Sequence, residues 1–254
     1  MSPPPKPGKQ RLDTLVVDRG LSDTRSRAQA LIIAGQVVVD DQRIDKAGTM
    51  VPVNAAIRLR GEANRYVSRG GLKLAGALRR FAADGLELAG RVAMDVGAST
   101  GGFTDCLLQL GVAKVHAVDV GYGQLAWKLA TDDRVVAHDR RNIRKLDPGE
   151  LGERVSLVVI DCSFISLVKV LPHLPPFLAP TADLVILVKP QFEVGKDNIG
   201  KGGIVRDDTL RVAALDAVRE AALGLGFQAR AHCDSDTHGR MGNREFLLWL
   251  TWAG

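Results

Sequence analysis

Residues 94–104 read Met-Asp-Val-Gly-Ala-Ser-Thr-Gly-Gly-Phe-Thr, and they are the most informative part of the chain. It overlaps the end of the apolar run 92–96 and precedes a segment with helical periodicity, so it forms the turn from a buried strand into a helix. Glycines in such a turn let the backbone approach a ligand closely. The spacing matches neither the GxGxxG pattern of dinucleotide sites nor the GxxxxGKS/T pattern of triphosphate sites, and the turn has no lysine to hold phosphates.

An acidic residue, Asp119, follows the next apolar run, 22 residues after Gly97. An acid at this distance accepts hydrogen bonds from the ribose of nucleotide-like cofactors. A glycine turn that need not hold a pyrophosphate, paired with such an acid, favours S-adenosylmethionine over NAD; the alternative is a glycine turn of another α/β protein. Polar residues after the third strand are candidates for contacting the adenine. The predicted cofactor residues are Gly97, Ala98, Ser99, Thr100, Gly101, Gly102, Phe103, Asp119, Asp139 and Asn142.

Strands and helices alternate outward from this turn. The expected strands are 92–96, 115–120, 135–138, 157–160, 184–188, 228–232 and 245–251. The expected helices are 72–83, 104–110, 125–130 and 209–224. Continuous Val/Ile/Leu strands that alternate with helices predict a parallel sheet covered on both faces, which is a Rossmann-like α/β domain.

Charged residues stand at strand ends of this sheet, where ligands collect in open α/β folds. The candidate catalytic residues are Lys73, Asp161, Lys189 and Glu245. Lys189 directly follows five apolar residues, where a lysine is costly to desolvate unless it is paired or functional; a snorkelling lysine is the alternative. Two lysines and two carboxylates suit methylation of a ribose hydroxyl, because a suitably placed lysine can accept the hydroxyl proton.

The positive charge is concentrated in the N-terminal third. Residues 1–80 contain 15 Lys/Arg and 7 Asp/Glu, or +8, whereas residues 81–254 contain 19 and 22, or −3. This asymmetry suggests a second, small α+β domain that binds nucleic acid; solvated basic helices are the alternative. A helix is expected at 23–33 with Ser22 as its N-cap, followed by short strands at 37–39 and 57–59. The candidate RNA contacts are Arg11, Arg19, Arg25, Arg27 and Arg43.

Several classes of protein are excluded by composition. The 254 residues are 46% hydrophobic and 25% charged, so wholesale disorder is excluded. No run of 18 uncharged apolar residues is present, and residues 1–10 lack the apolar part of a signal peptide. Three distant cysteines without CxxC spacing argue against a disulfide framework or a zinc site. We therefore expect a cytoplasmic protein with no metal and no membrane segment.

Five motifs carry a family resemblance. They occupy residues 66–73 (Tyr-Val-Ser-Arg-Gly-Gly-Leu-Lys), 97–104, 119–125, 161–167 (Asp-Cys-Ser-Phe-Ile-Ser-Leu) and 188–195 (Val-Lys-Pro-Gln-Phe-Glu-Val-Gly). Over nearly its whole length the chain resembles the TlyA proteins, bacterial ribosomal RNA 2′-O-methyltransferases that are also labelled hemolysins. The rival functions are a membrane-active cytolysin and an RNA-binding protein without catalysis.

The resemblance implies a domain order, a cofactor and a catalytic set. The expected parts are a flexible tail at 1–10, an S-four-type RNA-binding domain at 11–62, a linker at 63–71 and an FtsJ-like methyltransferase domain at 72–254. It implies that S-adenosylmethionine binds around 97–102 and Asp119. It implies a catalytic tetrad of Lys73, Asp161, Lys189 and Glu245. It also implies that residues 65–68 are an interdomain linker that communicates RNA or cofactor binding. The implied substrate is a cytidine of large-subunit ribosomal RNA, because the chain ends after its last strand as shorter members do. The implied partners are ribosomal RNA or ribosomal subunits.

Overall fold

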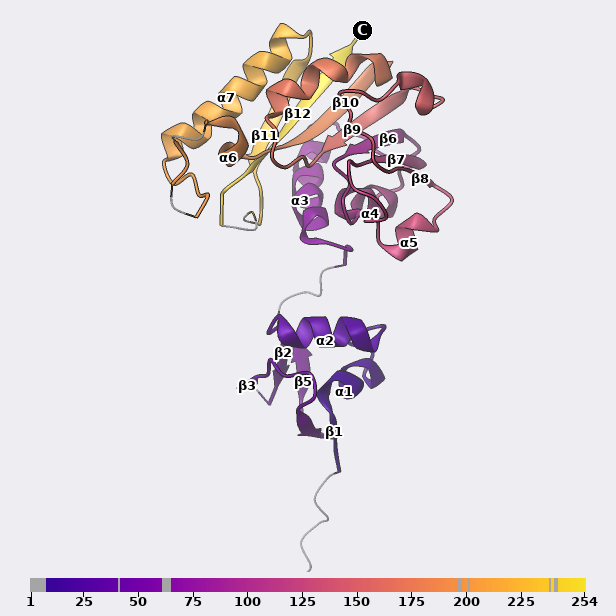
Figure 1. The fold of residues 1–254 in the computed structure, drawn as a ribbon, viewed down its shortest axis with the longest axis vertical. Helices are drawn as coiled ribbons and strands as arrows, with labels where there is room; N and C mark the ends of the chain where they lie inside the picture. Colours follow the sequence, from indigo (N-terminus) through magenta and orange to yellow (C-terminus); the bar gives the residue numbers. More distant parts are fainter. Residues whose placement is uncertain are drawn as a thin grey trace, which may run out of the picture. The chain divides into compact units, whose positions relative to one another are not determined.

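The computed structural model describes residues 8–40, 42–60, 65–195, 198–200, 202–237, 239 and 242–254. The chain forms two compact units, Met1–Arg65 and Tyr66–Gly254 (Figure 1). Most of the predicted tail, the last two residues of the predicted RNA-binding domain (61–62) and the first two of the predicted linker (63–64) lie outside the described residues.

The first unit contains two short helices and small antiparallel sheets. Its helices are α1 (Leu12–Asp18) and α2 (Arg25–Ile33). Its strands are β1 (Lys9–Arg11), β2 (Val37–Val39), β3 (Gln42–Arg43), β4 (Met50–Pro52) and β5 (Ile57–Leu59). β1 pairs with β4, and β2 lies between β3 and β5. The core of this unit is centred on Leu12, Val16, Ile32, Val37 and Val51.

Helix α2 begins at Arg25, two residues later than the sequence suggested. We expected Ser22 to be the N-cap, but Thr24 Oγ1 accepts the hydrogen bond from Arg27 N at 3.2 Å. Ser22 is buried, and its hydroxyl donates to the Thr24 carbonyl at 3.0 Å. Ser22 therefore belongs to the turn before the helix, and that prediction was wrong.

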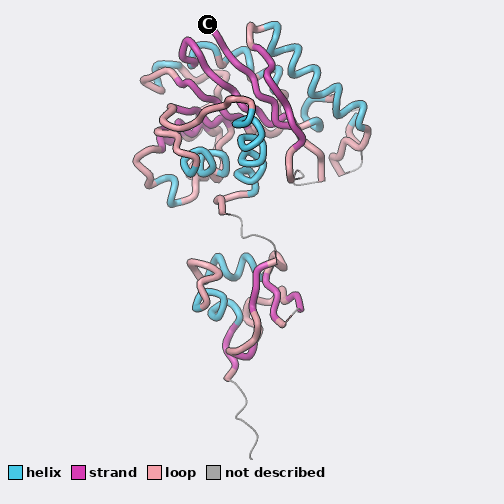
Figure 2. The backbone as a smooth tube through the Cα atoms, turned by 180° about the vertical axis from the view of Figure 1, so that it is seen from behind, coloured by secondary structure: helices cyan, strands magenta, loops and turns pink. Residues whose placement is uncertain are grey.

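The second unit is built on a seven-stranded sheet (Figures 1 and 2). Its strands are β6 (Val92–Val96), β7 (Lys114–Val118), β8 (Val135–His138), β9 (Val155–Ile160), β10 (Leu178–Val188), β11 (Gln228–Asp234) and β12 (Phe246–Ala253). Their spatial order is β11-β12-β10-β9-β6-β7-β8. The five strands from β10 to β8 are parallel, as predicted.

The last two strands correct the prediction of a wholly parallel sheet. β12 is antiparallel to β10, and β11 is antiparallel to β12. The physical reason is the connection between them. A parallel neighbour requires a crossover of a dozen or more residues, usually a helix, whereas β11 leads into β12 through the loop 235–245. The sheet is therefore mixed.

The helices of this unit are α3 (Arg69–Ala83), α4 (Gly102–Gln109), α5 (Trp127–Ala130), α6 (Pro190–Glu193) and α7 (Asp208–Gly224). Short 3-10 turns occur at η1 (Pro148–Glu150), η2 (Leu167–Lys169), η3 (Leu171–His173) and η4 (Pro175–Phe177). Residues 69–71, which we expected in the linker, form the first turn of α3. The cause is Ser68, which is extended and whose hydroxyl accepts a hydrogen bond from Gly70 N at 3.3 Å.

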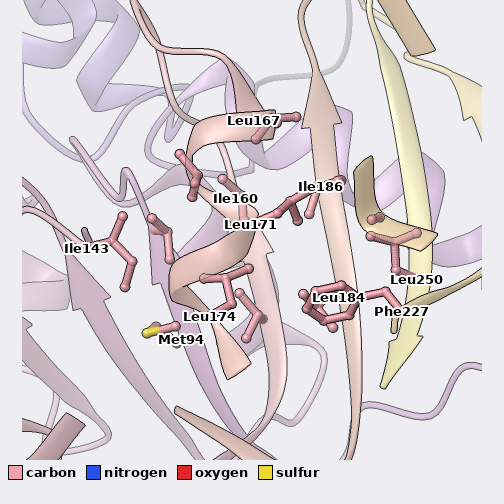
Figure 3. Close-up of a cluster of buried hydrophobic side chains, with 14 of the residues drawn as sticks. Met94, Ile143, Ile160, Leu167, Leu171, Leu174, Leu184, Ile186, Phe227 and Leu250 are labelled. Carbon is pink, nitrogen blue, oxygen red and sulfur yellow. The ribbon is translucent and has the colours of Figure 1, made fainter. Parts of the chain in front are cut away.

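Alternate residues of the central strands face two separate cores. Ile160 and Ile186 belong to one cluster, which α7 covers and which Figure 3 shows around Met94 and Phe227. Val159 belongs to the other cluster, which α3 and α4 cover. Burial of the sheet on both faces is therefore confirmed. Across the part of the chain that the structure describes, no helix is long and apolar enough to span a membrane.

Candidate active site

The glycine turn between β6 and α4 requires its glycines. Gly97 has φ +84° and Gly101 has φ +90°, a region that favours glycine. A Cβ at Gly97 would stand 2.8 Å from the carbonyl oxygen of Asp161, and one at Gly101 would stand 2.2 Å from Leu129 Cδ1. The packing around the turn therefore leaves no room for a side chain at either position.

Two cavities adjoin the turn at the carboxyl ends of the parallel strands. The smaller, about 590 Å³, is bordered by the turn together with Lys73, Asp161 and Lys189. The larger, about 1110 Å³, extends past Asp119 and the loop after Asp161. The predicted cofactor residues that line one or both cavities are Gly97, Ala98, Ser99, Thr100, Gly102, Phe103, Asp119 and Asn142.

Polar contacts fix the candidate cofactor residues that follow β7 and β8. Asp119 Oδ2 accepts a hydrogen bond from Ser99 N at 2.9 Å, and its Oδ1 accepts from Gly121 N at 2.7 Å. Asp119 therefore ties the glycine turn to the end of β7. Asp139 accepts from Gly123 N at 2.9 Å and so joins the loop after β8 to the loop after β7, whereas Asn142 accepts from Arg144 N at 3.1 Å within its own loop.

Two lysines are held by carboxylates beside the smaller cavity. Lys189, directly after β10, places Nζ 2.5 Å from Asp161 Oδ1, in an ion pair without the alignment of a hydrogen bond. It also donates to Ser163 Oγ at 2.9 Å. Lys73, on α3, forms a buried ion pair with Glu245, which precedes β12. The structure thus brings the four candidate catalytic residues together as two pairs.

Asp95, on β6 two residues before Gly97, has a role that the sequence did not predict. It is 0% exposed, and its Oδ2 accepts hydrogen bonds from Thr104 N at 2.9 Å and from Thr104 Oγ1 at 2.6 Å. These bonds hold the first turn of α4 against β6. Burial raises the pKa of Asp95 to about 7, and the nearby charges of Asp161 and Asp119 act in the same direction.

The loop after β9 adds residues that the sequence did not single out. Ser163 contacts Lys189, and Phe164 is 92% exposed with φ +66° and a ring centroid 5.4 Å from that of Phe192. In the sequence, Ser163 and Phe164 were distinguished only by lying in the motif 161–167, close to Asp161. Cys162, in the same loop, is largely buried, which raises the pKa of its thiol to about 12 and keeps it protonated.

Part of the expected linker 65–68 is anchored to the second unit. Tyr66 is 2% exposed and belongs to the core that α3 covers. The Val67 amide donates to Asp105 Oδ2 at 2.8 Å, and Ser68 caps α3. These contacts attach the entry of the chain to α3 and α4, the two helices beside the glycine turn.

The candidate RNA-binding arginines of the first unit differ in their partners. Arg11 and Arg25 both contact Asp13. Arg27 pairs with Asp23 at 3.2 Å. Two further arginines have other surroundings: Arg19 donates to the backbone carbonyls of Ala55 and Val53, and Arg43 lies on β3 with its guanidinium beside Gly35.

Comparison with known proteins gives matches along the chain. It is 48% identical over 243 residues to the 16S/23S rRNA (cytidine-2′-O)-methyltransferase TlyA of Mycobacterium tuberculosis, covering 95% of this chain and 90% of that protein. It is 44% identical over 247 residues to YqxC, a proposed rRNA methyltransferase of Bacillus subtilis, covering 97% and 87%. The solved structure of a proposed hemolysin from Streptococcus thermophilus is 41% identical, with a TM-score of 0.75 over 97% of this chain and 89% of that one.

Two family descriptions match successive parts of the sequence. The S4 domain matches residues 10–57, and the FtsJ-like methyltransferase matches residues 66–252. The resemblance inferred from the five motifs is therefore confirmed, as is the Rossmann-like fold. The chain belongs to the TlyA family, in which an S4 domain precedes an FtsJ-like methyltransferase domain.

Proposed function

We propose that this protein methylates the 2′-hydroxyl of a cytidine ribose in ribosomal RNA, with S-adenosylmethionine as the methyl donor. The observation that carries the proposal is the presence of Lys73 and Lys189 in one cavity with the glycine turn, each held by a carboxylate. The Mycobacterium tuberculosis relative, 48% identical, is named for methylating cytidine 2′-oxygens of 16S and 23S rRNA.

The residues beside the turn fit S-adenosylmethionine. Gly97 lines both cavities, and without a side chain its backbone can border a ligand closely. Each Asp119 oxygen that binds a backbone amide has a further lone pair for a ribose hydroxyl. The larger cavity, about 1110 Å³, slightly exceeds the usual range of roughly 300–1,000 Å³ for ligand sites. When bound, S-adenosylmethionine supplies an electrophilic methyl group.

Lys189 is the proposed general base. A ribose 2′-hydroxyl is a poor nucleophile until its proton leaves, and an amine within hydrogen-bond reach can take that proton in the transition state. Lys189 takes the proton as the neutral amine, with Asp161 and Ser163 holding its Nζ at the cavity, and the ammonium that forms then pairs with Asp161. Lys73, oriented by Glu245, supplies positive charge for the attacking oxygen.

The proposed RNA contacts divide between the two units. The five candidate arginines of the first unit would bind the phosphate backbone, which gives affinity and register but no sequence selection. Phe164, exposed next to Asp161, offers an aromatic surface on which an extruded base can stack. Residues 66–68 of the linker contact α3 and α4, so they would communicate RNA binding to the two helices beside the glycine turn.

The proposal is tested by mapping 2′-O-methyl groups on ribosomal RNA from cells with and without this protein. We expect a cytidine mark that depends on the protein, on large-subunit RNA. Purified protein with tritiated S-adenosylmethionine should then label isolated large subunits, with small subunits assayed in parallel to define the range of substrates. Unchanged marks in cells and no transfer to either subunit would overturn the proposed function.

A further inference from the structure

A buried carboxylate lies among the arginines of the first unit. Asp13, in the first turn of α1, is 0% exposed. Its Oδ1 accepts a hydrogen bond from Arg11 Nε at 3.0 Å, and its Oδ2 accepts from Arg11 Nη2 at 2.9 Å. The same Oδ2 accepts from Arg25 Nε at 3.0 Å and from Gln29 Nε2 at 2.8 Å. One carboxylate thus joins an arginine from β1 to an arginine from α2.

The side chains of Arg11 and Arg25 are exposed, although the carboxylate of Asp13 that they contact is buried. The side chains of Arg11 and Arg25 are 46% and 54% exposed, against 0% for Asp13. A guanidinium carries five N–H donors. Asp13 binds one edge of Arg11, and it binds Arg25 through Nε alone. Each arginine therefore keeps N–H donors that Asp13 does not use, on a side chain that is about half exposed.

The charges of this cluster are stable over the physiological pH range. The hydrogen bond from the Arg11 guanidinium holds the pKa of Asp13 well below its usual range, despite the opposing effect of burial. The carboxylate therefore remains ionised, and the cluster of one carboxylate and two guanidinium groups keeps a net positive charge.

We propose that Asp13 is the positioning residue of a two-arginine clamp in which Arg11 and Arg25 together bind phosphate groups of the RNA backbone. The proposal rests on the proposed function of this protein, and it adds a residue that sequence reasoning did not single out. Free arginine side chains lose rotamer freedom when they bind, whereas side chains already held in one geometry lose less. Guanidinium groups also recognise phosphate with paired N–H donors, so their orientation determines affinity.

The variant Asp13→Asn separates this role from a simple charge effect, because the two predict opposite signs. Removing an acid raises the positive charge of the unit, so a charge effect alone would tighten RNA binding and steepen its salt dependence. A positioning role predicts weaker binding, by about tenfold in Kd, with a salt slope smaller by about one. The measurement is filter binding of full-length protein to purified bacterial large ribosomal subunits over a range of KCl concentrations.

Asp23→Asn is the matched control. Asp23 is 84% exposed and pairs with Arg27, so its removal changes the net charge by the same amount without touching the clamp. We expect Kd for this variant to be unchanged or lower. A Kd for Asp13→Asn at or below that of the unmodified protein, with the same melting temperature, would overturn the clamp.

A second variant decides the question if Asp13→Asn does not fold. Arg25→Lys keeps the charge at an exposed position but lacks the fork that binds Asp13 and phosphate together, and we expect a Kd about tenfold higher. Affinity equal to that of the unmodified protein would contradict the clamp. Methyl transfer by the unmodified protein to the same subunits tests the proposed function separately. If no methyl transfer is seen, the proposed function fails. The direction of the change in Kd for Asp13→Asn still tests the clamp, because it is measured by binding alone.

Discussion

Both units hold cationic side chains against carboxylates, but they differ in how far the cations are exposed. In the first unit Asp13 is fully buried, and the arginines that it holds are about half exposed. In the second unit the lysines themselves are buried, with Lys73 and Lys189 each 10% exposed at the side chain. An exposed arginine can meet a phosphate that remains in water, whereas a buried lysine can meet only the group that enters its cavity.

Two fully buried aspartates sharpen this comparison. Asp13 faces two guanidinium groups, and its pKa is lowered. Asp95 accepts hydrogen bonds from Thr104 and has Asp161 and Asp119 as charged neighbours, and its pKa is raised to about 7. Burial favours the neutral acid in both cases, so the partner decides the outcome. The first unit therefore keeps its buried aspartate ionised, whereas the buried aspartate of the second unit has a pKa of about 7.

The largest expected effect is the loss of Lys189. Lys189→Ala should lower kcat by roughly 10²–10⁴-fold, because removal of a general base typically has that effect. The Kd for S-adenosylmethionine should stay nearly unchanged, since the proposed cofactor residues lie in the glycine turn and after β7 and β8, whereas Lys189 follows β10. Transfer is measured with tritiated methyl groups, and cofactor binding by calorimetry.

Lys189→Arg tests whether the charge or the proton acceptor matters. Arginine keeps the positive charge near Asp161 but does not lose its proton at physiological pH. We expect this variant to be nearly as inactive as Lys189→Ala. Substantial activity in the arginine variant would assign Lys189 an electrostatic role and exclude it as the base.

The next largest effect concerns the division of work between the units. A shortened chain beginning at Asn64 retains Lys73 and the glycine turn but lacks the first unit. Residues 81–254 carry a net charge of −3, so their own attraction for phosphate is weak. We expect kcat/KM on ribosomal subunits to fall by on the order of 10²-fold through lost effective concentration, with cofactor affinity retained. Equal rates at sub-saturating RNA would show that the first unit is not the anchor.

The sequence predicted the parts of the molecule that depend on local pattern. The alternation of apolar strands and helices gave the five parallel strands, and strand ends gave Asp161 and Lys189, because parallel strands end at one edge. Strand direction in β11 and β12 depends on the connection between them, which periodicity does not describe. The pairing of Lys73 with Glu245 joins residues 172 positions apart, and it was not predicted: the sequence and the family resemblance gave both residues as members of the catalytic set without saying which residues contact each other. The sequence did not predict the role of Asp13, because an aspartate among arginines is usually an exposed surface residue and its burial depends on the tertiary structure.

A smaller effect should appear in the pH dependence of stability at Asp95. Its folded pKa of about 7 lies above the unfolded value of 3.8, so the folded state keeps the proton that the unfolded state releases. The free energy of unfolding therefore decreases as pH rises from about 4 to 7, and is constant beyond. Asp95→Asn removes this site. The difference in stability between variant and unmodified protein should shift in favour of the variant by at least about 1.4 kcal/mol over that window.

Urea unfolding at several pH values measures this difference, and a constant offset between the two proteins would contradict a raised pKa. The corresponding substitution Asp13→Asn provides the contrast. The folded pKa of Asp13 is lowered, so its contribution to stability is present above the unfolded pKa and is lost as pH falls through the folded value. The two aspartates should therefore give pH dependences of opposite sign.

The smallest effect is expected at Ser163, which tests how firmly the second unit must hold its lysine. Its hydroxyl accepts a hydrogen bond from Lys189 Nζ at 2.9 Å, while Asp161 forms the ion pair. Ser163→Ala leaves the ion pair in place and removes one hydrogen bond, whose net worth is about 0.5–1.5 kcal/mol, so kcat should fall about fivefold. KM for the RNA and Kd for the cofactor should not change, because only the orientation of the base is affected. Ser163→Thr keeps the hydroxyl and should restore most of the rate. If Ala and Thr are equally slow, the volume of this side chain rather than its hydrogen bond matters, and Asp161 alone positions Lys189.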